Sequence, residues 1–206
     1  LRVARREGGT RCYALHEMSR GAADVDVDAT LDALMDVIVA KYAPLPAASL
    51  GQLASHLAAA APQWREQRAA MLSRTHARLP NARVDGVVWV WPAGENPRSL
   101  RHAVDAAVRL LAPFDPIVWD RRRFELLWGW AYRFEAYTPA PQRVRGYYAM
   151  PLLWHEQVIG WGNLAWRDGR LRAEFGYVAG KAPRGASYRT ALAEELARLE
   201  SFLTPR

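Results

Sequence analysis

The spacing of apolar residues changes along this chain from a helical period to a strand period, and the change divides the sequence into two units. Between residues 24 and 79, leucine, methionine and valine recur every three or four positions, which is the spacing of one helix face. From Ala131 onward, apolar residues alternate with polar ones, as in a strand with one buried face. Pro92–Pro97 lies between the two patterns. The sequence therefore predicts an α+β protein.

The first unit, residues 24–92, is predicted to be a winged helix-turn-helix domain. Apolar periodicity predicts three helices, over Asp24–Tyr42, Ser49–Leu57 with Ser49 as its N-cap, and Pro62–Arg78. A type I′ hairpin is predicted at Asp85-Gly86, within Arg83–Trp91. Three helices followed by a hairpin is the order of such a domain. Gly8-Gly9 is a second hairpin signal, and residues 1–20 are predicted to be the wing that ends a preceding unit of the same kind.

The third predicted helix carries arginines that we expect to contact DNA, because this helix of a winged helix-turn-helix domain enters the major groove. Four arginines oppose a single acid, Glu66: Arg65, Arg68, Arg74 and Arg78. The region of the first helix instead carries five aspartates before its first cation, Lys41. This distribution of charge, acidic on the first helix and basic on the third, favours DNA binding by the third helix. A basic face that is merely solvated is the alternative interpretation.

The second unit, residues 98–206, is predicted to be a small antiparallel β-barrel or half-barrel with a C-terminal helix. Period-two patterning predicts four strands, over Ala131–Thr138, Arg143–Leu153, Gln157–Arg167 and Arg170–Val178. Helices are predicted over Arg98–Leu111, running into a strand, over Trp119–Trp128 and over Ser187–Leu203. Alternation places Arg143 and Arg145 on one strand face and Val144 on the other, in the core. Six aromatic residues are expected to form core rather than to stack bases: Trp128, Trp130, Tyr132, Trp154, Trp161 and Trp166.

The charge of the chain points to a polyanionic partner. Lysine and arginine number 28 against 21 aspartates and glutamates, which gives a net charge of +7. All of these cations except Lys41 and Lys181 are arginines, whose planar forks pair with phosphate, although the nucleotide composition of the gene is an alternative cause. Double-stranded DNA is therefore the expected partner.

Composition disfavours several classes of site and location. The single cysteine, Cys12, supplies neither an internal disulfide nor a zinc framework, which fits a reducing cytosol. The five histidines lack metal-ligand spacing and no phosphate-binding loop or dinucleotide fingerprint occurs, so we expect no metal and no small-molecule cofactor. Apolar stretches such as Leu31–Ala40 contain aspartates and are too short to span a membrane.

The densest motif is LLAPFDPIVWDRRR, which runs from Leu110 to Arg123. It is followed by YRFEAYTPA at residues 132–140 and by RVRGYYAMP at residues 143–151. In this order and spacing the three segments closely resemble the C-terminal part of the YcaQ/AlkZ family of interstrand-crosslink-repair DNA glycosylases, over about residues 98–177. Val3–Gly8 and Tyr13–Leu15 also resemble the end of the preceding winged-helix unit of that family.

The resemblance implies tandem winged-helix domains and a C-terminal β-barrel that together hold DNA on a concave basic surface. It also implies hydrolysis of the N-glycosidic bond of crosslinked or bulky alkylpurines. The catalytic Gln-x-Gln or Gln-x-Asp motif of the family belongs to its first winged-helix domain, upstream of this sequence. The glutamines of this chain do not reproduce that motif: Gln52, Gln63, Gln67, Gln142 and Gln157. No catalytic residue is therefore assigned.

Two carboxylates lie close to the basic motif, and a glycosylase needs a polar or acidic group beside C1′ to position water. We nevertheless expect Asp115 to form an Asx turn and Asp120 to cap a helix or to pair with an arginine. The remaining DNA contacts are assigned to one edge of the second unit: Arg121, Arg122, Arg123, Arg143 and Arg145. At most two of the three consecutive arginines can face one ligand, because each helical residue turns by about 100°.

These patterns lead to one preferred interpretation and two alternatives. We expect the DNA-binding C-terminal region of a crosslink-repair DNA glycosylase, monomeric, associated with the nucleoid in the cytoplasm and without contact to a membrane. One alternative is a shortened, non-enzymatic winged-helix protein that binds DNA, such as a regulator. The other is a scaffold that uses its arginine surface to bind acidic proteins.

Overall fold

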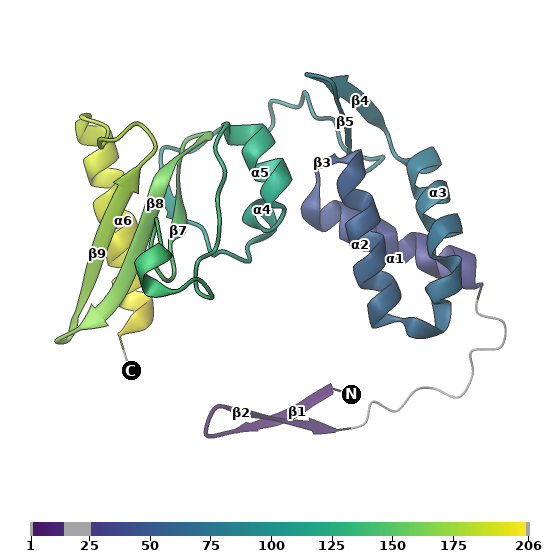
Figure 1. Cartoon of the computed structure of the whole chain (residues 1–206), viewed down its shortest axis with the longest axis horizontal. Coiled ribbons are helices and arrows are strands. Elements are labelled where there is room, and N and C mark those ends of the chain that lie inside the picture. The colour runs from purple at the N-terminus through teal and green to yellow at the C-terminus, as the bar shows by residue number, and fades with distance from the viewer. Residues whose placement is uncertain (1, 15–25, 205–206) are drawn as a thin grey trace.

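The computed structural model describes residues 2–14 and 26–204 of the chain (Figure 1). Over these residues the protein is mixed α and β, with six α-helices and antiparallel sheets. None of the described helices is long and apolar enough to cross a membrane. The expected start of the first helix at Asp24, and the part of the expected wing that follows Ala14, lie outside the described residues.

The N-terminal hairpin forms at the predicted turn. Strands β1 (Arg2–Glu7) and β2 (Thr10–Ala14) pair antiparallel. Gly8 and Gly9 connect them with φ angles of 52° and 84°, a left-handed geometry that glycine adopts without a steric penalty. The glycine pair therefore fixes this hairpin locally.

The next elements form what we call the helical unit, from α1 to β5. Its elements are, in chain order, α1 (Val27–Tyr42), β3 (Leu45–Pro46), α2 (Ala47–Ala60), the 3-10 helix η1 (Pro62–Gln67), α3 (Arg68–Arg78), β4 (Asn81–Val84) and β5 (Val87–Val90). The three strands form an antiparallel sheet in the order β3-β5-β4. Asp85 and Gly86 have φ angles of 47° and 79°, so the predicted hairpin is confirmed.

The three predicted helices of this unit exist, with different boundaries. Asp26 is the N-cap of α1, and its carboxylate accepts the Ala29 N–H at 3.0 Å. The second helix begins at Ala47 after Pro46, so the expected N-cap at Ser49 is wrong and Ser49 lies buried inside the helix. The third is divided, because Trp64 has non-helical backbone angles and a 3-10 segment precedes α3.

One apolar core holds the helical unit together. Leu31, Met35 and Val39 form a stripe along α1 at the spacing that the sequence predicts. They pack against Leu50 of α2 and Met71 of α3, and all five side chains are buried. Each contributes about 1.5–3 kcal/mol relative to an exposed side chain.

The remaining elements form what we call the sheet unit, from β6 to α6. They are, in chain order, β6 (Val108–Leu110), α4 (Pro116–Trp119), α5 (Arg121–Trp128), the 3-10 helix η2 (Ala140–Gln142), β7 (Met150–Trp154), β8 (Gln157–Arg167), β9 (Arg170–Tyr177) and α6 (Ala186–Leu203). Strands β6 to β9 form an antiparallel sheet in sequential order, a half-barrel rather than a closed barrel (Figure 1).

Two of the four predicted strands are confirmed, at Gln157–Arg167 and Arg170–Tyr177, and several other expectations in this unit are wrong. Residues 131–149, all of them described, form no strand, so the predicted first strand is absent and the second begins at Met150. Residues 98–107 are likewise described and contain no helix, although the following strand exists as β6. Val144 is 77% exposed and lies outside the core.

The half-barrel packs apolar side chains on both faces. On one face Val108 and Leu152 contact Tyr188 and Ala191 of α6. On the other, Val158 contacts a second cluster that contains Phe124 of α5. Strand alternation sends the adjacent Leu152 and Leu153 to opposite clusters, and the β7–β8 register shifts beside them, where β8 carries one extra residue, Ile159.

Four of the six aromatic residues expected in the core belong to one of these two clusters or pack against it. Tyr132 is buried, Trp128 and Trp130 pack against the cluster around Phe124, and Trp154 packs against the cluster around Leu152. Trp161 and Trp166 differ: Trp161 is half-buried and lies against Arg145, and Trp166 is exposed near the end of β8.

Candidate nucleic-acid interface

The dense motif runs from the end of β6 through α4 into the first turn of α5, and its two aspartates are helix caps. Asp115 accepts the Ile117 N–H at 2.9 Å at the start of α4, and Asp120 accepts the Arg123 N–H at 3.0 Å at the start of α5. Asp120 is buried and also accepts a hydrogen bond of 2.5 Å from the hydroxyl of Ser49. Both carboxylates therefore have the structural roles that the sequence favours.

The three consecutive arginines point in different directions. Arg123 is 3% exposed, and its guanidinium donates to the carbonyls of Tyr42 and Pro116. Arg121 donates to the carbonyls of Val118 at 2.7 Å and Pro113 at 3.0 Å. Burial lowers the pKa of both guanidinium groups, partly offset by nearby Tyr132 for Arg121 and Asp120 for Arg123.

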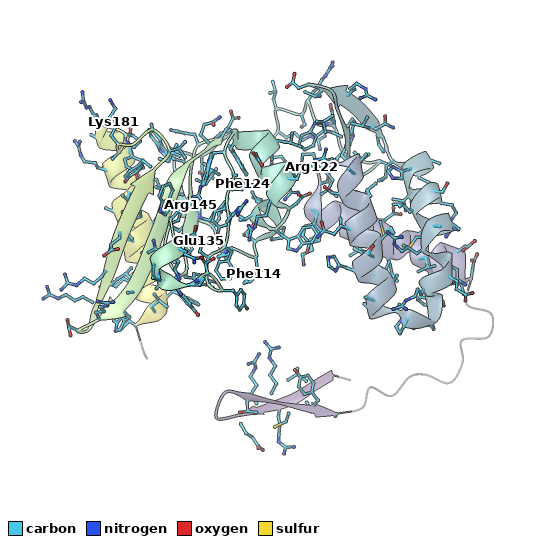
Figure 2. The ribbon with its side chains drawn as sticks, in the orientation of Figure 1. Phe114, Arg122, Phe124, Glu135, Arg145 and Lys181 are labelled. Carbon is cyan, nitrogen blue, oxygen red and sulfur yellow. The ribbon has the colours of Figure 1, made fainter. Side chains whose placement is uncertain are left out.

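Arg122 is the exposed member of the run and stands beside an open hollow of ≈ 540 Å³ (Figure 2). We call this hollow the Arg122 groove. Three arginines and one carboxylate line it, together with Ala131, Tyr132 and Phe134: Arg121, Arg122, Arg133 and Glu125. Arg121 also lies over the ring of Tyr132, 4.5 Å from its centroid. The groove is therefore basic with an aromatic wall.

Glu135 organises the irregular segment between α5 and β7. Its buried carboxylate accepts the N–H groups of Arg145 at 2.7 Å and Gly146 at 3.2 Å, which takes the place of strand pairing. Burial acts to raise the pKa of Glu135, but these N–H groups and the charge of Arg145 outweigh it, so the pKa lies below its ordinary value. The buried group is therefore held as a carboxylate.

Arg145 lies against the rings of two tryptophans that also contact each other, and these contacts hold its backbone beside the sheet (Arg145 is labelled in Figure 2). Its guanidinium carbon lies 5.2 Å from the ring centroid of Trp130 and 5.4 Å from that of Trp161. It donates to the Ala131 carbonyl at 2.8 Å, and Asn163 donates to the Arg145 carbonyl at 2.7 Å. The segment is therefore fixed to β8 at this point.

A second open hollow, of ≈ 880 Å³, lies where this segment meets the β8–β9 hairpin. We call it the Arg145 groove. Three arginines and two carboxylates line it, with Tyr147, Tyr148 and Asn163 among the other residues: Arg145, Arg167, Arg172, Asp168 and Glu174. Phe134 of the Arg122 groove and Tyr148 of the Arg145 groove pack with ring centroids 5.3 Å apart, so the two grooves adjoin.

Arg143 is not on a strand and does not share a strand face with Arg145. It donates to the Thr138 carbonyl at 2.8 Å, and its guanidinium carbon lies 5.0 Å from the ring centroid of Tyr147. The two arginines thus belong to one irregular segment, in which each is stacked on a different aromatic side chain.

The arginines of α3 are largely engaged with α1. Arg74 pairs with Asp32 at 3.0 Å, and Arg78 pairs with Asp36 at 2.7 Å. Arg68 is half-buried and donates to the Gly51 carbonyl at 3.1 Å, whereas Arg65 is exposed on η1. The opposite charges that the sequence shows on the first and third helices therefore meet inside the helical unit.

Arg133, Arg167 and Arg172 line the grooves but are absent from the sequence-based assignment. Arg167 lies at the Asp168-Gly169 turn of the β8–β9 hairpin, and Arg172 of β9 pairs with Ala165, so strand alternation places Asn163, Arg167 and Arg172 on one face. That alternation, combined with the hairpin turn, is a signal in the sequence that identifies Arg167 and Arg172.

A family model described as DNA glycosylase AlkZ-like matches residues 1–202. No solved structure matches the chain.

Proposed function

The chain belongs to the AlkZ-like DNA glycosylase family, and from this premise we propose that it forms the part of a DNA-repair glycosylase that holds double-stranded DNA. The observation that carries the proposal is the pair of adjoining basic grooves on the sheet unit. Together they present six arginines against three carboxylates. An excess of arginine along a hollow surface matches the charge of a phosphate backbone.

The nine arginines assigned from the sequence contribute unequally to the proposed interface. We propose Arg122 as the phosphate contact of its run, since the Arg123 guanidinium is buried against backbone carbonyls. Arg145, held against its two tryptophans, provides a positioned cation at the second groove. Arg121 lines the Arg122 groove. Arg143 places a positive charge against Tyr147, which lines the Arg145 groove.

We propose further that the chain consists of the end of one winged-helix unit at residues 1–20, a winged helix-turn-helix domain at 24–92 and the C-terminal unit at 98–206. The order α1, β3, α2, α3, β4, β5, with a β3-β5-β4 sheet, supports the middle assignment. In this arrangement η1 contacts DNA through Arg65, and α3 through Arg68, Arg74 and Arg78. Arg74 and Arg78 reach phosphates only by exchanging their carboxylate partners.

The proposed substrate class is crosslinked or bulky alkylpurine, with hydrolysis of the N-glycosidic bond. Release of alkylated bases from duplex tests it; the chain alone is expected to show none above the spontaneous rate, because its glutamines do not reproduce the catalytic motif of the family. Asp115→Asn and Asp120→Asn leave any such release intact, because both carboxylates serve as caps and asparagine caps equally well. Release that disappears in either variant would contradict the structural assignment of these two residues.

The affinity for double-stranded DNA is measured by fluorescence anisotropy with a labelled, fully paired duplex. Arg122→Glu and Arg172→Glu each reverse a charge at one groove, and each is expected to weaken binding about tenfold or more. Arg189→Glu makes the same change at an exposed position of α6, which packs on the opposite face of the sheet, and serves as the matched control. Equal affinities for the groove variants and the control would refute the interface.

A further inference from the structure

Four aromatic side chains form an exposed cluster between the two grooves. Phe134 lies at its centre and packs nearly perpendicular to the rings of the other three, with centroid distances of 5.2 Å to Phe114, 6.3 Å to Tyr137 and 5.3 Å to Tyr148. We call these four residues the aromatic ridge. Phe114 is labelled in Figure 2.

The ridge is unusually open for aromatic residues. Phe114 is 64% exposed, Tyr137 93% and Tyr148 41%. Large apolar side chains that cluster at a surface mark a site of interaction, whereas single exposed ones do not. The edge-to-face packing against Phe134 restricts the rings of Phe114 and Tyr148, which reduces the conformational entropy lost when a ligand stacks on them.

The charges beside the ridge indicate what covers it. Phe134 lines the Arg122 groove and Tyr148 lines the Arg145 groove, so the ridge has arginines on both sides. A cationic track interrupted by exposed aromatic rings is the arrangement that binds unpaired nucleic acid, with phosphates on the cations and bases stacked on the rings. An apolar surface of a protein partner would not require arginines at both flanks.

We propose that the aromatic ridge binds an unpaired base of a DNA strand whose neighbouring phosphates lie in the two grooves. The inference rests on the proposed function and narrows it: the preferred DNA is a duplex interrupted by unpaired nucleotides. A regular duplex keeps its bases stacked inside, so it contacts the grooves but leaves Phe114 and Tyr137 uncovered.

The test compares two labelled duplexes of equal length, one fully paired and one with two unpaired thymidines at its centre, by fluorescence anisotropy. The protein is expected to bind the interrupted duplex about 5- to 150-fold more tightly, the range given by one stacked base. The double variant Phe114→Leu/Tyr137→Leu keeps apolar side chains but removes two rings that line neither groove, and it is expected to lose the preference while retaining affinity for the paired duplex. Tyr137→Phe keeps the ring and is expected to retain the preference.

The outcomes separate this inference from the proposed function. Tight binding of the paired duplex without a preference overturns the ridge as a base-binding site and leaves the proposed function standing. A preference that survives in the double leucine variant also overturns it, since the flexibility of the interrupted duplex then accounts for the difference. Failure to bind either duplex overturns the proposed function, and the inference with it.

Discussion

Ser49 and Asp120, 71 positions apart in the sequence, are joined by a buried hydrogen bond of 2.5 Å from the serine hydroxyl to the aspartate carboxylate. One oxygen of Asp120 accepts this bond and the other caps α5. Arg123, one helical turn along, donates to the carbonyl of Tyr42 at the end of α1. The most distinctive motif of the sequence therefore joins the helical unit to the sheet unit.

Removal of the Asp120 carboxylate is expected to destabilise the protein substantially. Asp120→Ala loses a helix cap, worth about 1 kcal/mol, and a buried hydrogen bond to a charged group, worth about 1.5–3 kcal/mol. Asp120→Asn keeps an equally good cap and a partner for Ser49, so it is expected to lose much less. Urea unfolding of both variants measures the difference, and equal losses would contradict the double role of Asp120.

The pKa of Glu135 predicts how stability depends on pH. Because the folded pKa lies below the ordinary value of about 4.3, the carboxylate stabilises the fold above that pH and loses this contribution as the pH falls through the folded pKa. Glu135→Gln is therefore expected to be less stable than wild type at pH 7, with the gap narrowing in acid. A gap that widens as the pH falls would show the opposite shift.

The exposure of Val144 distinguishes the observed irregular segment from the predicted strand, which would bury this side chain. Val144→Asp is expected to change the free energy of unfolding by less than about 0.5 kcal/mol, because the side chain already lies in solvent. Leu152→Asp, in the buried face of β7, is expected to cost at least about 3 kcal/mol. Comparable losses in urea unfolding would place Val144 in a core after all.

Position 146 requires a glycine, both because its φ angle is positive and because the side chain of Asn163 lies close to it. Its φ is 118°, and an added Cβ would lie 2.5 Å from Oδ1 of Asn163. Gly146→Ala is therefore expected to cost about 1–3 kcal/mol. Gly94→Ala is the matched control, because a Cβ there meets no atom within 4 Å. Thermal unfolding compares the two, and an unchanged melting temperature for Gly146→Ala would contradict the close approach to β8.

Local signals in the sequence predict those parts of the fold that short segments determine. Gly8-Gly9 and Asp85-Gly86 specify their turns through φ angles that few other residues adopt, and the stripe along α1 specifies its buried face. Strand β3 has two residues and exists through its pairing with β5, a contact between distant segments that a local pattern does not reveal. Residues 131–149 carry strand-like alternation, but Glu135 takes the N–H groups that a ladder would use.

The sequence predicts only part of the candidate site, because contacts between distant segments determine the rest. The sequence identifies the motif and its arginines, and the structure determines which of them are free to meet a ligand. Arg74 and Asp32 are visible as opposite charges on two helices, yet their pairing depends on how α1 and α3 pack. Arg145 reaches its position against Trp130 and Trp161 through contacts across 15 and 16 positions, which composition does not indicate.

The salt dependence of duplex binding tests the central claim most directly, because it counts the phosphates that the two grooves neutralise. The logarithm of affinity falls with the logarithm of salt concentration at a slope of about −0.9 for each phosphate contacted. Arg122→Gln and Arg172→Gln are each expected to make that slope shallower by about one, and Arg189→Gln on α6 to leave it unchanged. Slopes that are the same for all three variants and wild type would show that DNA is held elsewhere on the protein.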